Sequence, residues 1–147
     1  MWLVFPAQKA DIEEIHSIEE ECFPTPWSKD SFHAELSHSY SHLWIAKSSK
    51  TDSIVGFICF WVLWDEMHIL NVAVRKKFQG KGIGSLLLKK AIQYAIKKGL
   101  KWIGLEVRET NIKAIRLYEK FGFQKQGRRP RYYYDTGEDA ILMTLKL

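Results

Sequence analysis

Phe78-Gln79-Gly80-Lys81-Gly82-Ile83-Gly84-Ser85 joins a strand-like run, Ile69 to Val74, to a strongly helical run, Leu86 to Lys98. Three glycines within five positions let the chain turn tightly and bring bare N–H groups close to a ligand. The helix that follows adds the positive end of its dipole at the same place. This stretch therefore predicts a backbone cradle for phosphate groups, and an anionic cofactor is the first functional hypothesis.

The length and composition are those of one globular domain. The chain has 147 residues, of which 46% are hydrophobic and 27% charged, and no repeat, low-complexity block or linker-like stretch interrupts it. At this length, folding buries roughly 70% of the surface that the unfolded chain exposes. We therefore expect a single domain over residues 1–147.

The net charge of +5, from 22 basic and 17 acidic residues, fits an anionic small molecule or a nucleic acid as partner. A solvated, lysine-rich surface explains the same charge without any partner. The basic cluster at residues 127–131 lacks interleaved stacking aromatics upstream, so no direct contact with nucleic acid is expected. Charge alone does not select a function.

The sequence shows no signal for export or membrane insertion. Residues 1–6 are apolar for too short a run and lack a basic leader, and residues 54–64 fall short of the roughly 20 residues that a spanning helix requires. Cys22 and Cys59 sit in apolar patterns without a paired spacing, which indicates buried free thiols. We expect a cytoplasmic protein that does not contact membranes.

Hydrophobic periodicity predicts a mixed sheet covered by helices. Strands are expected near residues 3–5, 43–47, 54–63, 67–74, 102–107, 123–126 and 140–146, and helices over residues 11–22, 28–36, 86–98 and 111–122. Asp11 and Glu14 predict a capping box for the first helix. The fold class is therefore α/β (α+β mixed), with a mostly antiparallel central sheet, one β-α-β crossover and helices on both faces.

Two familiar phosphate-binding loops do not fit. The P-loop pattern needs four residues between its first glycine and a Gly-Lys-Ser/Thr, which this stretch does not supply. The dinucleotide fingerprint G-x-G-x-x-G is nearly matched by Gly80, Gly82 and Ser85, and Glu106 follows about 20 residues later, where a ribose-binding acid would lie. The third glycine is missing, however, and too few residues remain for the second half of that fold.

Gln79-x-x-Gly82-x-Gly84 resembles the Q/R-x-x-G-x-G/A motif of the GNAT family of N-acetyltransferases, which holds the pyrophosphate of acetyl-CoA. Leu70-Asn71-Val72-Ala73-Val74 leads into it, and Asn111-x-x-Ala114-x-x-Leu117-Tyr118-x-x-x-Gly122-Phe123 follows it, in the order of the family's elements. The resemblance covers nearly the whole chain. It implies the GNAT fold and acetyl-CoA as cosubstrate.

Within the family, Leu105-Glu106-Val107-Arg108, Arg131-Tyr132-Tyr133 and residues 137–143 resemble the RimI-type ribosomal protein alanine N-acetyltransferases. This resemblance implies an N-alpha-acetyltransferase for the N-terminal alanine of a small-subunit ribosomal protein. Separately, we expect a monomer or weak oligomer. Two alternatives stay open. One is a lysine or small-amine acetyltransferase on the same fold, and the other is a non-catalytic CoA-binding or ribosome-associated protein.

Glu106 is the expected general base. It interrupts an apolar strand that should be covered on both faces, where an unpaired carboxylate is costly. By resemblance it accepts the proton of the amine, through a water molecule. The alternative is a structural salt bridge with Arg108 or Lys101. Partial burial is expected to raise the pKa of Glu106 toward the useful range.

Tyr118 is the expected general acid, because a phenol can protonate a thiolate of comparable basicity at little cost. Its spacing with Ala114, Leu117 and Phe121 also fits an ordinary core stripe, so the catalytic role comes from the resemblance. Asn111 is expected to cap a helix and, by resemblance, to contact the cofactor.

The remaining site residues follow from the resemblance. The expected cofactor-binding residues are Val72, Ala73, Val74, Gln79, Gly80, Lys81, Gly82, Ile83, Gly84, Ser85, Asn111 and Tyr118. Trp27, Tyr132 and Tyr133 are expected to contact the acceptor peptide. The histidines His33, His38 and His42 lack the spacing of a zinc site, so no metal is expected.

Overall fold

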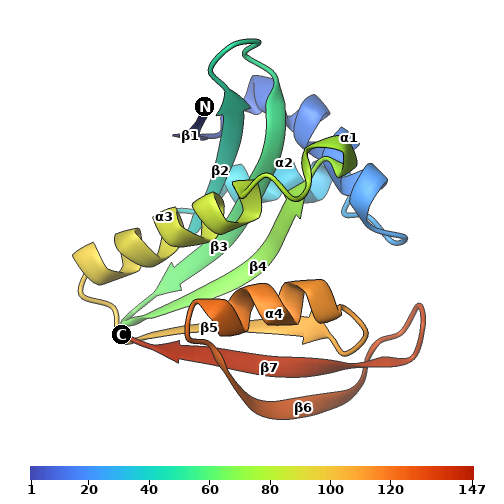
Figure 1. The fold of residues 1–147 in the computed structure, drawn as a ribbon, viewed down its shortest axis with the longest axis vertical. Coiled ribbons are helices and arrows are strands. Elements are labelled where there is room, and N and C mark those ends of the chain that lie inside the picture. The colour runs from blue at the N-terminus through green and yellow to red at the C-terminus, as the bar shows by residue number, and fades with distance from the viewer.

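A computed structural model describes residues 1–147 as a seven-stranded sheet in the order β1-β2-β3-β4-β5-β7-β6 (Figure 1). The strands are β1 (Trp2–Pro6), β2 (Ser41–Ser48), β3 (Ile54–Leu63), β4 (Glu66–Val74), β5 (Trp102–Arg108), β6 (Gln124–Tyr133) and β7 (Glu138–Lys146). The α-helices are α1 (Ile12–Cys22), α2 (Lys29–Ser37), α3 (Ile83–Lys97) and α4 (Ile112–Lys120), with short 3-10 helices η1 (Lys9–Asp11) and η2 (Lys76–Phe78). None of these helices is long and apolar enough to cross a membrane.

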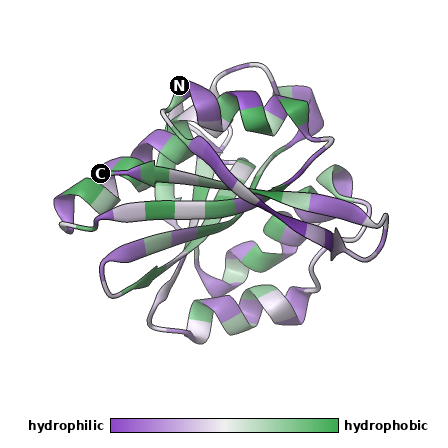
Figure 2. Ribbon diagram, turned by 90° about the horizontal axis from the view of Figure 1, so that it is seen from below, coloured by the Kyte–Doolittle hydropathy of each residue, from purple (hydrophilic) through white to green (hydrophobic).

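Every neighbouring pair of strands is antiparallel except β4 and β5, which are parallel and joined by α3. The helices form two layers with the strands between them (Figure 2). A larger core includes buried residues of α3 and α4, such as Leu87 and Ile115, and a smaller core includes Ile15 of α1 and Phe32 of α2. The expected mixed, mostly antiparallel sheet with helices on both faces is confirmed.

The strands β4 and β5 pair only at one end. Their register joins Glu66–Ile69 to Trp102–Leu105 and then stops. On the other side of β4, the pairing with β3 shifts between Cys59 and Phe60, so that Leu70 becomes an extra residue in β4. Such a bulge bends a strand and increases its twist. Beyond it β4 and β5 diverge, as Figure 1 shows, and the backbone of residues 71–74 has no sheet partner on the β5 side.

Three expectations about element ends were wrong. The helix α3 begins at Ile83, inside the glycine-rich stretch, because Gly82 already supplies the turn. The strand β6 extends to Tyr133 rather than residue 126, since an edge strand tolerates Pro130 and its register shifts against β7. Asp11 closes η1 by accepting a hydrogen bond from the Gln8 backbone N–H at 2.8 Å, and it makes no capping box with Glu14.

Candidate active site

The glycine-rich stretch forms a turn followed at once by a helix start. Gly80 and Gly82 have positive φ angles of 81° and 83°, and Gly82 is the N-cap of α3. The first amides of the helix, from Ile83 to Ser85, have no intrahelical acceptor and lie at the positive end of the dipole. Gln79 attaches the stretch to the end of β4, since its Nε2 donates to the Val74 carbonyl oxygen at 3.0 Å. The geometry is that of an anion site.

A cavity of about 540 Å³ runs from this helix start along the end of β4 to α4, and its size is that of a small-molecule site. Eleven of the twelve expected cofactor-binding residues line it, namely Val72, Ala73, Val74, Gln79, Gly80, Gly82, Ile83, Gly84, Ser85, Asn111 and Tyr118. Lys81 is exposed and does not line the cavity. The motifs in the sequence did not point to the basic residues Lys113, Arg116 and Lys120, which line the cavity from α4. Their spacing of three and four residues on one helix was the available signal.

A second cavity of about 360 Å³ continues from the first on the β5 side. Both cavities share lining residues at their junction, namely Cys22, Phe23, Val72, Asn111, Ala114 and Tyr118. Only the second is lined by Glu106, together with Arg108, Thr136 and Glu138. The free thiol of Cys22 is therefore only partly buried at this junction, whereas Cys59 is buried as expected.

The expected acceptor residues Trp27, Tyr132 and Tyr133 do not line either cavity. The ring of Trp27 packs against Phe32 at 5.3 Å between centroids, next to the smaller core. Tyr132 and Tyr133 pack against each other at 5.0 Å, and the guanidinium of Arg108 lies 4.1 Å from the centre of the Tyr133 ring. The contact of these three aromatic side chains with a peptide stays a prediction.

Glu106 has a different ionic partner from those expected. Its Oε1 lies 3.0 Å from Nε2 of His68 in β4, while Arg108 pairs with Asp135 and Lys101 with Asp65. The hydrogen bond from His68 is the main cause that lowers the pKa of Glu106, against the opposing effect of burial. The expected rise in this pKa was wrong, because the sequence does not show that β4 places a histidine beside it. Glu106 is therefore ionised at neutral pH.

Tyr118 lies at the junction of the two cavities and belongs to the larger core. Burial raises the pKa of Tyr118 to about 12, so the phenol is neutral at physiological pH. Its ring packs against Phe123 at 5.6 Å between centroids. Asn111, close by, accepts a hydrogen bond from the Ala114 backbone N–H at 3.2 Å and caps α4, as expected.

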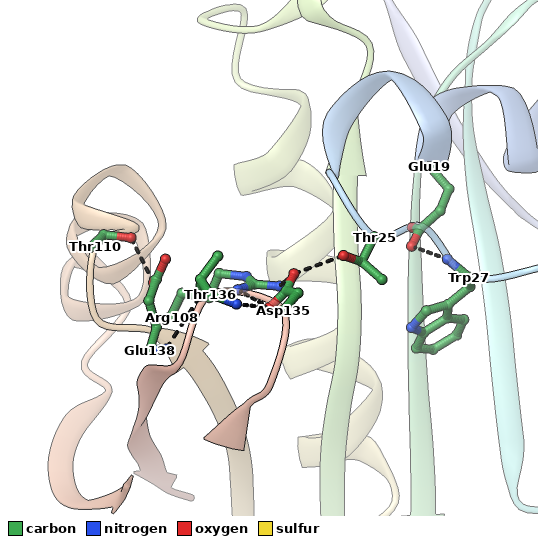
Figure 3. Close-up of polar contacts among 8 residues, drawn as sticks. All are labelled: Glu19, Thr25, Trp27, Arg108, Thr110, Asp135, Thr136 and Glu138. Carbon is green, nitrogen blue, oxygen red and sulfur yellow. Dashed lines mark hydrogen bonds and ion pairs between the residues drawn. The ribbon is translucent and has the colours of Figure 1, made fainter. Parts of the chain in front are cut away.

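Thr25, Arg108 and Asp135 form a polar clasp (Figure 3), and of these three residues Arg108 lines the second cavity. Arg108 donates to both carboxylate oxygens of Asp135 at 3.0 and 2.9 Å, and the Thr25 hydroxyl donates to the same carboxylate at 2.8 Å. These bonds, led by the one from Arg108, lower the pKa of Asp135 to about 2. The clasp joins the loop between α1 and α2, residues 23–28, to the loop between β6 and β7, residues 134–137.

Glu19 of α1 is the one charged side chain that is buried, with 1% of its surface exposed. Its carboxylate accepts a hydrogen bond from the Trp27 backbone N–H at 2.9 Å, drawn in Figure 3, and another from Asn71 Nδ2 at 2.6 Å. Burial raises the pKa of Glu19 despite these bonds. The residue holds the loop at residues 23–28 against β4, next to the bulge.

The sheet opens between two parallel strands, and the start of the crossover helix offers free amides there, an arrangement that suits a ligand bearing phosphate groups. Residues 12–123 match the acetyltransferase (GNAT) family. Because this match spans most of the chain, the chain belongs to the GNAT family and is an acetyltransferase. The fold expected from the motif is thereby confirmed.

Several relatives with a named substrate cover most of the chain. The ribosomal protein bS18-alanine N-acetyltransferase of Escherichia coli (strain K12) is 32% identical over 142 residues, which are 95% of this chain and 94% of the relative. A Bacillus subtilis (strain 168) protein, provisionally named for the same activity, is 37% identical over 134 residues, or 90% of this chain and 87% of that protein. The crystal structure of the Escherichia coli ribosomal-protein-S18-alanine N-acetyltransferase has a TM-score of 0.91 at 30% identity, covering 99% of this chain and 94% of that one. The resemblance to RimI-type enzymes is confirmed.

Proposed function

We propose that the chain transfers the acetyl group of acetyl-CoA to the α-amino group of the N-terminal alanine of ribosomal protein bS18. The observation that carries this proposal is the junction of two cavities at Tyr118, one with an anion site and the other with an ionised carboxylate. The relatives named for this activity support the choice of acceptor. A ribosomal acceptor also agrees with a cytoplasmic location.

The cofactor would lie in the first cavity. Amides at the start of α3 would hold its pyrophosphate, and the backbone of residues 72–74, which has no strand partner on the β5 side, would hold the pantetheine arm like an added strand. The basic side chains of Lys113 and Arg116 would add charge near the phosphates. When bound, acetyl-CoA supplies an activated acyl group whose thiolate is a good leaving group.

The second cavity would hold the acceptor amine, and its chemistry suits an α-amino group. Such a group has a pKa near 8, so roughly a tenth is neutral at pH 7, against less than about a thousandth of a lysine side chain. A weak base is therefore sufficient for an N-terminal substrate. In this proposal Glu106 accepts the amine proton through a water molecule, and Tyr118 gives a proton to the departing thiolate.

Mass spectrometry of peptides incubated with acetyl-CoA tests this proposal. The N-terminal peptide of bS18 should gain one acetyl group on its first residue, and a control peptide with a blocked α-amino group and a free lysine should gain none. Acetylation of the lysine would favour the lysine or small-amine alternative. No acetylation of any amine, with coenzyme A bound, would favour the non-catalytic alternative.

A further inference from the structure

The ion pair between Glu106 and His68 connects the acceptor cavity to solvent. The Glu106 side chain is 12% exposed and the His68 side chain 40% exposed, with 3.0 Å between Oε1 and Nε2. Glu106 is among the residues that line the second cavity, and His68 is not. One member of the pair therefore faces the cavity and the other lies at the protein surface.

The register of the sheet keeps the surroundings of His68 open. His68 is opposite Gly104 of β5, two residues before Glu106. Side chains alternate along a strand, so positions 104 and 106 share one face of the sheet. A β-carbon at Gly104 would meet no atom within 4 Å, and no side chain there separates the imidazole from water.

The proposed reaction must release one proton in each turnover. The acceptor ammonium loses one proton to become nucleophilic, and its nitrogen loses a second as the C–N bond forms. The thiolate that leaves when the C–S bond breaks takes up only one. The remaining proton must therefore pass from the cavity to bulk water.

Glu106 alone is poorly suited to carry that proton, because hydrogen bonding from His68 lowers the pKa of its carboxyl. Around Glu106, β6 contributes the charge of Arg129 and the phenol of Tyr133, and β7 places the apolar Leu142 opposite it. His68 is the neighbour whose imidazole has two ring nitrogens, so that one can accept a proton while the other releases one.

We infer that Glu106 and His68 act as one proton-accepting unit, in which His68 is a positioning residue that orients the carboxylate and passes its proton to solvent. This inference rests on the proposed acetyl transfer. An amine N–H bond breaks as an O–H bond forms on Glu106. That O–H bond then breaks as an N–H bond forms at Nε2 of a neutral His68 whose proton is on Nδ1, and the imidazolium returns to its neutral form by giving the Nδ1 proton to bulk water.

Substitution with chemical rescue tests this role. In a weak buffer, His68→Gln and His68→Ala should each lower kcat about tenfold, less than the loss expected for the proton acceptor itself, with the KM for acetyl-CoA unchanged. Added imidazole should restore much of the kcat of His68→Ala, because a small base can diffuse to the open surface beside Gly104. The wild type and the control His33→Ala, changed on α2 away from the cavities, should not respond to imidazole.

A second measurement does not depend on turnover. Carbon-13 NMR of the Glu106 carboxyl should show its pKa rise in His68→Ala, because the main cause that lowers it has been removed. Full activity of both His68 variants, or a slow variant that imidazole does not restore, would overturn the proton-transfer role while leaving the acetyltransferase proposal standing. A wild-type protein that acetylates no peptide would instead remove the proposed function, and this inference with it.

Discussion

Gly82 and Gly84 both lie at the start of α3, but only Gly82 has a backbone conformation that favours glycine. Its φ angle is 83°, whereas a β-carbon at Gly84 would meet its nearest atoms at 3.7 Å in Leu117 and 3.9 Å in Val74. Both distances are ordinary van der Waals contacts. The two glycines therefore differ in what a methyl group would do at each position.

We predict that Gly82→Ala weakens coenzyme A binding about tenfold, because a left-handed alanine costs roughly 1–2 kcal/mol and the turn would relax away from it. Gly84→Ala, the matched control, should bind nearly as the wild type does. Isothermal titration calorimetry with coenzyme A measures both. Equal affinity of the two variants would contradict the proposed cradle.

Glu106 and Tyr118 carry the proposed proton transfers. Glu106→Gln and Tyr118→Phe should each lower kcat about a hundredfold while coenzyme A still binds. Since the pKa of Tyr118 is about 12, its ionisation should not limit activity as pH rises from 7 to 10. Steady-state kinetics across this pH range measure the kcat of both variants and of the wild type. The exposed Glu119→Gln serves as control. A near-normal rate in either variant would remove that residue from the mechanism.

At the scale of elements, the polar clasp of Thr25, Arg108 and Asp135 joins two loops to the end of β5, where Arg108 lines the second cavity. The pKa of Asp135 is lowered to about 2, so its interactions add stability above its unfolded pKa. The stability that ionised Asp135 adds is lost as the pH falls from its ordinary pKa of 3.8 through about 2. The clasp is therefore expected to stay closed at every pH suitable for an assay.

Asp135→Ala should open this clasp, since it removes the acceptor of both Arg108 and Thr25. We expect the KM for the acceptor peptide to rise severalfold while the KM for acetyl-CoA stays constant, because only the second cavity is affected. Hydrogen exchange should increase in residues 23–28 and 134–137. The exposed Asp30→Ala on α2 serves as control, and an unchanged peptide KM would show that the clasp does not shape the acceptor site.

At the scale of the whole molecule, the buried Glu19 makes stability depend on pH. Burial raises its pKa above the ordinary value of 4.5, so the native state binds this proton more tightly than the unfolded state does. The contribution of Glu19 protonation to the free energy of unfolding is complete below pH 4.5. It is lost as pH rises through the raised pKa of Glu19. Its hydrogen bonds to Trp27 and Asn71 nevertheless join the α1 layer to the sheet.

Glu19→Gln removes this titration. The free energy of unfolding of the wild type, relative to the variant, should therefore decrease as pH rises from 4.5 upward. Urea unfolding followed by tryptophan fluorescence at several pH values measures the difference, with the exposed Glu66→Gln as control. A difference that grows with pH would mean that the ionised carboxylate is the form that the native state prefers.

Much of the fold was predictable because it follows from local patterns. Apolar spacing located α1 and α3, and the cap at Asn111 located the start of α4. The length of β6 was not predictable, because its residues are almost all exposed and only pairing with β7 extends the strand to Tyr133.

Local patterns in the chain predicted the glycine-rich turn and the order of elements around it, because glycine spacing and helix capping act over a few residues. The pairing of His68 with Glu106, and the contact of Thr25 with Asp135 110 positions away, arise from the folded sheet. Those contacts depend on the register of β4 against β5 and on where two loops meet. Register and loop packing are properties of the assembled sheet, so no local pattern in the chain encodes them.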